Sequence, residues 1–118
     1  MLIKYKTCYE KIAMGLLAFM PEEKNVKKLQ LTIKKYEEDP RWHLFLWRDQ
    51  EDMVGLVGVS MLEDETVQLN HLSVSPSFRE EGLGKKIISA IKDHYVKKKV
   101  VPSVQTALFF VKCDTETE

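Results

Sequence analysis

Apolar residues recur at helical spacing in two segments near the start of the chain. In residues 10–20 the stripe consists of Ile12, Leu16, Leu17 and Met20. Pro21 follows directly, and because proline cannot continue a helix, the pattern predicts a short helix that runs as far as this proline. In residues 26–38 the stripe consists of Leu29, Ile33 and Tyr36. Asn25 precedes this segment and Asp39-Pro40 follows it, so a second amphipathic helix is predicted between them.

The pattern changes to strand-like alternation at Trp42. Residues 42–47 alternate two sets of side chains, residues 53–62 read as a partner strand interrupted by Gly55 and Gly58, and residues 66–74 form a third strand that ends before Pro76. The connecting segments are short and charged. Three consecutive strands joined by short polar turns predict an antiparallel meander.

A long helix is predicted to begin at Gly82. Its apolar stripe consists of Leu83, Ile87, Ile88, Ile91 and Tyr95. Lys97 to Lys99 suit the negative end of the helix dipole, Val100-Val101 is a short strand, and Ser103 suits the N-cap of a last helix over residues 104–113. With a possible strand at residues 2–6, the order is β-α-α-β-β-β-α-β-α. This order predicts one α+β domain over residues 1–118, a mixed and mostly antiparallel sheet flanked by helices.

Composition narrows the classes of function. Eighteen Lys and Arg residues balance eighteen Asp and Glu residues, so the chain has no overall basic field of the kind that a dedicated nucleic-acid-binding protein carries. No apolar run reaches the roughly 20 residues that a membrane span needs, and the charged N-terminus is unlike a signal peptide. Cys8 and Cys113 lie at opposite ends of the chain, without metal-site spacing. We therefore expect a cytoplasmic protein without nucleic-acid or membrane partners, whose anion sites are local.

One local anion site is indicated between residues 72 and 86. A strand ends at Pro76, a short loop follows, and Gly82 and Gly84 open the long helix. Glycines let backbone N–H groups approach a ligand closely, and a helix N-terminus offers unpaired donors and a partial positive charge. Lys85 and Lys86 oppose the helix dipole there, so they are better explained beside a bound anion.

Two common phosphate-binding motifs do not fit this segment. A Walker P-loop would need glycine and a hydroxyl residue where the chain has Arg79 and Lys86. A dinucleotide fingerprint would need a small residue at Ile87 and glycines directly after the strand. A structural loop, in which the glycines bind nothing, stays open at this point.

The segment resembles the acetyl-coenzyme A binding motif of the Gcn5-related N-acetyltransferase family, Leu-x-Val-x-Pro-x-x-Arg/Gln-x-x-Gly-x-Gly/Ala. The matching residues are Leu72, Val74, Pro76, Arg79, Gly82 and Gly84. The predicted order of elements is similar to that of the family over nearly the whole chain. More narrowly, residues 11–17, 19–21, 44–47 and 109–113 resemble the small acetyltransferase-like proteins encoded in riboflavin-biosynthesis operons of Gram-positive bacteria.

The resemblance implies acetyl-coenzyme A as cofactor and a small-molecule or protein amine as acceptor. The pantetheine arm would lie in a gap between the strand ending at Val74 and the Val100-Val101 strand, and the pyrophosphate would be held by backbone N–H groups of residues 79–85. The implied cofactor-binding residues are Leu72, Ser73, Val74, Arg79, Glu80, Glu81, Gly82, Leu83, Gly84, Lys85 and Ser103.

The chain departs from the family at the positions that usually carry proton transfer. Gln68 stands where many members have a carboxylate base, Phe110 where many have a tyrosine acid, and Ser103 where an asparagine commonly contacts pantetheine. His71 titrates near neutrality and is the remaining catalytic candidate on this strand, although alternation places it opposite Leu72, at the sheet surface. The family's last two strands also lack a counterpart, and the edge this would leave suggests a homodimer.

Three hypotheses remain from the sequence. The first is an acetyl-coenzyme A-dependent N-acetyltransferase that acts by direct attack of an amine on the thioester. The second is a coenzyme A-binding protein without transferase activity, which Gln68 and Phe110 motivate. The third is an interaction module in which the two glycines have only a structural role.

Overall fold

A computed structural model of the chain describes residues 1–20, 25–103 and 106–107. The sheet strands are β1 (Leu2–Lys4), β2 (Trp42–Asp49), β3 (Asp52–Met61), β4 (Thr66–Val74) and β5 (Lys99–Pro102). The helices are α1 (Glu10–Leu17), α2 (Val26–Glu38) and α3 (Leu83–His94), with 3-10 turns η1 (Thr7–Tyr9) and η3 (Pro76–Glu81). No helix in this part of the chain is long and apolar enough to cross a lipid bilayer.

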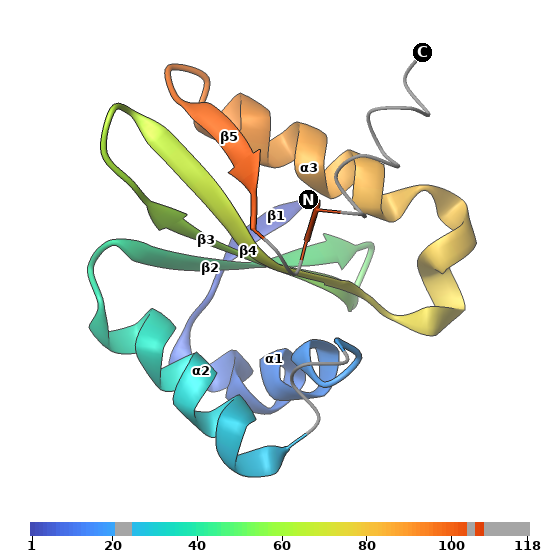
Figure 1. The fold of residues 1–118 in the computed structure, drawn as a ribbon. Helices are drawn as coiled ribbons and strands as arrows, with labels where there is room; N and C mark the ends of the chain where they lie inside the picture. Colours follow the sequence, from blue (N-terminus) through green and yellow to red (C-terminus); the bar gives the residue numbers. More distant parts are fainter. Residues whose placement is uncertain (21–24, 104–105, 108–118) are drawn as a thin grey trace.

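The five strands form one sheet in the order β1-β2-β3-β4-β5. Neighbouring strands are antiparallel except for β4 and β5, which are parallel because α3 connects them as a crossover. The predicted meander of β2, β3 and β4 is therefore confirmed, and so is the α+β class. Figure 1 shows that α1 and α2 lie on one face of the sheet and α3 on the other.

Each face of the sheet has its own hydrophobic core. On the α3 side, Ile87 and Ile91 of the helix are fully buried against Val57, Val59 and other strand residues. On the α1/α2 side, the predicted residues Leu29, Ile33 and Tyr36 pack on Leu44, Leu46 and Leu56. The predicted stripes of α2 and α3 thus face the sheet, as amphipathic helices do when they cover one.

The start of α2 follows its sequence signal. The Asn25 side-chain oxygen accepts hydrogen bonds from the N–H groups of Lys27 at 2.8 Å and Lys28 at 3.3 Å. These donors have no partner within the helix itself, so Asn25 acts as the N-cap.

Two predicted boundaries need correction, and a third prediction is not tested. Helix α1 ends at Leu17, where Phe19 and Met20 already form tighter bonds to the carbonyls of Leu16 and Leu17, and Ile12 is 43% exposed, off the buried stripe. Helix α3 ends at His94, so the lysines that were expected to finish it lie in the following turn and at the start of β5. The last helix expected over residues 104–113, with Phe110 and Cys113, lies outside the described residues.

Candidate functional site

The central feature of the site is the place where β4 and β5 part. Their pairing covers Thr66 to Leu69 on β4 and ends at the pair Leu69 and Pro102. Strand β4 then continues to Val74, beyond the end of β5 (Figure 1). The Ser103 N–H closes the paired part by donating to the Leu69 carbonyl oxygen at 3.0 Å. The resemblance implies that the pantetheine arm binds beside β4 beyond this point, and that expectation stays a prediction.

A glycine in the left-handed conformation connects this strand to α3. After η3, Gly82 adopts φ 70° and ψ 22° and stands at the N-cap of α3 without a side-chain cap. A Cβ atom built on Gly82 would meet no atom within 4 Å. The first N–H groups of α3 therefore adjoin open space at Gly82, the position where the sequence predicts that a phosphate binds.

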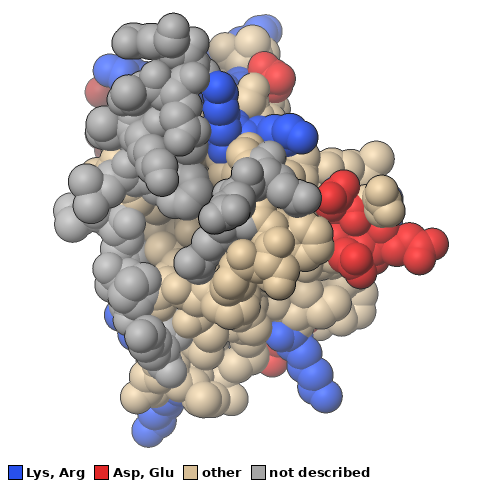
Figure 2. Space-filling model, turned by 90° about the vertical axis from the view of Figure 1, so that its right-hand side faces the viewer, with Lys and Arg blue, Asp and Glu red and all other residues tan. Residues whose placement is uncertain are grey.

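The first turn of α3 is basic. Figure 2 views the side of the molecule that carries the loop of residues 76–82, where basic and acidic side chains form separate groups. No acidic residue lies in the first turn of α3, which contains Lys85 and Lys86. Lys86 also lines a cavity of about 290 Å³ with Trp47 and Arg48 of β2. Lys85 and Lys86 both line another cavity of about 620 Å³ together with Gly82 and Trp47, so both lysines border the space beside the start of α3.

A β-bulge interrupts β4 at the end of the paired region. Gly58 of β3 pairs with His71 and Val59 pairs with Leu69, so Asn70 has no partner in this ladder. Asn70 is 8% exposed, and its side-chain nitrogen is buried without a hydrogen-bond acceptor among the described residues. Beyond the bulge, side chains alternate in a new phase, because the extra residue shifts the two-residue period.

His71 is buried under α2, and the expectation of a histidine at the sheet surface is wrong. It is 6% exposed, and its Nδ1 atom lies 2.5 Å from the Tyr36 hydroxyl of α2. Gly58, the β3 partner of His71, makes room for this contact, because a Cβ atom at Gly58 would overlap the Tyr36 hydroxyl and ring. No local sequence pattern could predict this contact, because α2 and β4 are far apart in the chain.

The other predicted residues of β4 differ in their surroundings. The Ser73 hydroxyl donates to the Leu16 carbonyl oxygen of α1 at 2.5 Å, so its side chain ties β4 to that helix. Leu72 and Val74 belong to the core under α3. Gln68 pairs with Ser60 on one side and Val101 on the other, and is partly exposed. Because the side chains of Leu72, Ser73 and Val74 are engaged within the protein, only their backbone groups could bind a ligand.

The loop residues and Ser103 complete the predicted set. Arg79, Glu80 and Glu81 lie in η3, directly before Gly82, while Leu83 and Gly84 are buried at the start of α3. The Ser103 hydroxyl lies 3.5 Å from the Asn70 carbonyl oxygen and 3.2 Å from the Thr106 hydroxyl. The predicted binding residues thus belong to β4, η3 and the start of α3, with Ser103 directly after β5, and their role in binding stays a prediction.

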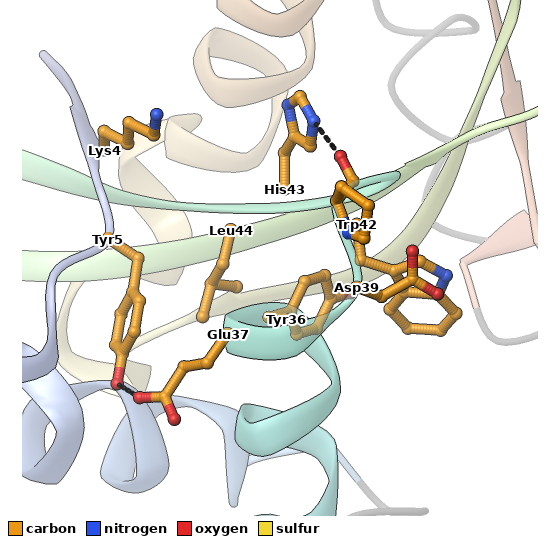
Figure 3. Close-up of a pocket in the computed structure, with 9 residues that line it drawn as sticks. Lys4, Tyr5, Tyr36, Glu37, Asp39, Trp42, His43 and Leu44 are labelled. Atoms are coloured by element: carbon orange, nitrogen blue, oxygen red, sulfur yellow. Dashed lines mark hydrogen bonds between the residues drawn. The ribbon is translucent and has the colours of Figure 1, made fainter.

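A separate cavity of about 230 Å³ lies beside β1 and β2, next to the C-terminal end of α2 (Figure 3). The Tyr5 hydroxyl donates to the Glu37 carboxylate at 2.7 Å, and burial together with this bond raises the pKa of Tyr5 above its usual range. The Arg41 N–H, and then Lys35, lower the pKa of Asp39. Both carboxylates of this cavity are therefore already engaged within the protein, and none of its lining residues comes from β4.

A second polar contact joins β2 to the end of α3. The His43 ring bonds the Pro40 carbonyl oxygen through Nε2 and the Tyr95 hydroxyl through Nδ1, each at 3.1 Å. Because a carbonyl only accepts, Nε2 carries the proton and Tyr95 donates to Nδ1. Burial raises the pKa of Tyr95 to about 12. His43 therefore has a structural partner on each nitrogen and is not available for chemistry at β4.

Metal chemistry has no candidate ligand set in the described part. Across residues 1–20, 25–103 and 106–107, no three His, Cys, Asp or Glu side chains gather closely enough to bind a metal ion.

Comparison with known proteins gives a consistent result. Residues 9–112 match the model of the Acetyltransferase (GNAT) family. A protein of Bacillus methanolicus, named as an uncharacterized N-acetyltransferase in the lysA 3′ region, is 49% identical over 114 residues, which cover 97% of this chain and 95% of that protein.

Solved structures share the fold at low sequence identity. An aminoglycoside N-acetyltransferase in complex with CoA superimposes with a TM-score of 0.76 at 13% identity, covering 98% of this chain and 84% of that one. A ribosomal-protein-alanine N-acetyltransferase from Brucella melitensis gives a TM-score of 0.72 at 17% identity, covering 87% and 79%. One of these names indicates a small-molecule acceptor and the other a protein acceptor, so the fold does not decide between them.

Proposed function

Because the chain belongs to the Acetyltransferase (GNAT) family, we propose that it is an N-acetyltransferase that moves the acetyl group of acetyl-coenzyme A to an amine. The observation that carries the proposal is the end of the β4–β5 pairing at Leu69 and Pro102. Beyond this point β4 continues to Val74, in the direction of the glycine at the start of α3. An extended ligand can bind such a strand as an additional strand would.

The residues present suit coenzyme A. The open space over Gly82 adjoins the N-terminus of α3, whose N–H groups and dipole favour the pyrophosphate. Arg79 to Lys85 would supply these N–H groups, and Leu72, Ser73 and Val74 would supply backbone groups along the pantetheine arm. Ser103 would border the acyl end from β5. The buried donor of Asn70 is a polar group that still lacks an acceptor among the described residues.

Acetyl-coenzyme A would supply an activated thioester, whose thiolate is the leaving group. The protein's share of the chemistry is then to position the amine, stabilise the carbonyl oxygen as it gains negative charge, and exclude water. Gln68 cannot accept the proton that the amine loses, and His71 is buried against Tyr36. We propose that this proton leaves through solvent, with His71 as the alternative acceptor.

The pH dependence of the rate separates these two routes. If solvent takes the proton, kcat/KM rises about tenfold per pH unit up to the pKa of the acceptor amine. A thiol-release assay of wild type and His71→Gln between pH 5.5 and 9.5 measures how kcat/KM depends on pH. A plateau near pH 6 to 7 that disappears in His71→Gln would contradict the solvent route and identify His71 as the base.

The proposed acceptor is an amine, either of a small molecule or of a protein. Thiol release from acetyl-coenzyme A over a panel of polyamines, aminoglycosides, amino acids and peptides tests the proposal. Release that depends on one amine class, with the acetylated product seen by mass spectrometry, supports it. Coenzyme A binding without release across the panel favours instead a binding protein without transferase activity, which Gln68 at the usual base position motivates.

The cellular setting remains a prediction. We propose a cytoplasmic protein, and the narrower resemblance to proteins of riboflavin operons rests on the sequence segments alone. The position of the gene relative to riboflavin-biosynthesis genes would check that resemblance.

We also propose a homodimer. Several large apolar side chains of the described residues are exposed, among them Val26 at 63% and Leu31 at 64% on α2. Among the strands that the structure describes, β5 stands at one edge of the sheet. Exposed apolar groups and strand edges are commonly covered by a partner. Light scattering is expected to give twice the chain mass of 13.8 kDa at micromolar concentrations. A monomer mass at all concentrations up to hundreds of micromolar would exclude the dimer.

A further inference from the structure

Two neighbouring cavities form a groove between α3 and the end of β2, which we call the β2–α3 groove. The cavities of about 290 Å³ and about 620 Å³ share Trp47 and Lys86, so they adjoin. The larger one follows α3 from Gly82 to Asp93, and its volume is in the range of small-molecule sites. Neither cavity is lined by β4 or β5, so the β2–α3 groove lies apart from the place where those strands diverge.

Two cations border the smaller cavity from opposite elements. Arg48 of β2 is half-buried, and Lys86 belongs to the first turns of α3. The Arg48 Nη2 atom donates to the Met1 sulfur at 3.4 Å, which is a weak acceptor for a guanidinium. In the part of the chain that the structure describes, neither cation forms an ion pair, although Asp49 lines the same cavity. Two cations beside a cavity, neither of them paired with a carboxylate, favour an anionic ligand such as a phosphate.

The wall that the two cavities share contains an aromatic ring. Trp47 packs on the core under α3 and is only half-buried, so part of it borders the groove. A tryptophan ring can stack on a nucleic-acid base, and this contact tolerates any base because each base has a π-face. Ser89 and Ala90 line the larger cavity with small side chains, which leave room for a planar group.

We propose that the β2–α3 groove binds a nucleoside phosphate, with the phosphate between Arg48 and Lys86 and the base against Trp47. Two sources could supply this chemistry. One is a free nucleotide. The other is the adenosine 3′-phosphate end of coenzyme A, since Lys86 follows Gly82 by four residues, or about 6 Å along the helix. For this second source the inference rests on the proposed function.

Calorimetric titration of adenosine monophosphate into the ligand-free protein tests the groove without the coenzyme. Arg48→Gln and Lys86→Gln are each expected to weaken binding about tenfold, because each removes a charge-assisted hydrogen bond to the phosphate. Arg41→Gln is the matched control. It removes the same charge from an exposed residue outside both cavities, so wild-type affinity is expected. A thermal melt of each variant shows that it is folded.

Two further titrations distinguish the sources. If the groove holds the end of the coenzyme, wild type binds coenzyme A about tenfold more tightly than dephospho-coenzyme A, and Arg48→Gln loses this difference. Adenosine monophosphate then no longer binds to protein saturated with coenzyme A. If the groove holds a free nucleotide, the two coenzymes bind equally and adenosine monophosphate still binds to the saturated protein.

Tryptophan fluorescence tests the contact with the base. Trp42→Phe leaves Trp47 as the one tryptophan of the chain, and adenosine monophosphate is expected to quench its emission. The proposal is overturned if adenosine monophosphate does not bind the ligand-free wild type, if Arg48→Gln and Lys86→Gln bind it as wild type does, or if this emission does not change. These results leave the proposed function standing as long as wild type binds coenzyme A, and that function fails if neither coenzyme binds.

Discussion

Replacing Gly58 by alanine is expected to lower the free energy of unfolding by about 3 kcal/mol, because the new methyl group would occupy the place of the Tyr36 hydroxyl. Tyr36 is 6% exposed and packs edge-on against Trp42 with 5.0 Å between ring centroids, so its ring cannot swing away freely. Moving the ring would also break the hydrogen bond to His71 and leave a buried nitrogen less well satisfied. Overpacking and the lost bond therefore act together.

Gly15→Ala is the matched control for this prediction. A Cβ atom at Gly15 meets nothing within 4 Å, and the residue lies within α1. Alanine is a better helix former, so this variant is expected to gain up to about 1 kcal/mol. Urea denaturation of the three proteins measures both changes. A Gly58→Ala variant as stable as wild type would show that α2 does not hold His71 in the way described.

Replacing Gly82 by asparagine is expected to weaken coenzyme A binding at least about 30-fold, which corresponds to about 2 kcal/mol. Gly82 has φ 70°, a conformation that asparagine tolerates better than other residues with a side chain. The variant should therefore fold, while its side chain occupies the open space beside the first N–H groups of α3. Loss of affinity would then come from blocked access to those groups rather than from unfolding.

The control for this variant is Asp64→Asn. Asp64 also has a positive φ of 57°, but it lies in the turn between β3 and β4. Its substitution also removes a negative charge, so it tests whether overall charge alone changes binding. We expect wild-type affinity for Asp64→Asn in the same calorimetric titration. Equal coenzyme A affinity in Gly82→Asn and wild type would show that the pyrophosphate does not bind at the start of α3.

Much of the fold could be predicted because local patterns and tertiary structure agree in this chain. The stripes of α2 and α3, the cap at Asn25 and the end of β4 before Pro76 are each encoded within a few residues. Helix α1 was predicted too long, because Pro21 marks where a helix must have stopped rather than where its last turn closes.

The interior of the site could not be predicted in the same way. His71 was expected at the sheet surface, yet it lies beneath Tyr36, a residue 35 positions earlier in the chain. Gly58 was noted only as an interruption of a strand, although it makes room for that tyrosine. Asn70 was not predicted as a site residue at all. A bulge depends on the register between two strands, and no pattern within one strand reveals it.

Calorimetric titration of acetyl-coenzyme A into the wild-type protein tests most directly whether this chain binds the coenzyme. We expect saturable binding of one molecule per chain, with a dissociation constant on the order of micromolar to hundreds of micromolar, and a melting temperature that rises with the logarithm of ligand concentration. Absence of both binding heat and thermal shift at millimolar coenzyme, in a sample shown to be folded, would contradict it.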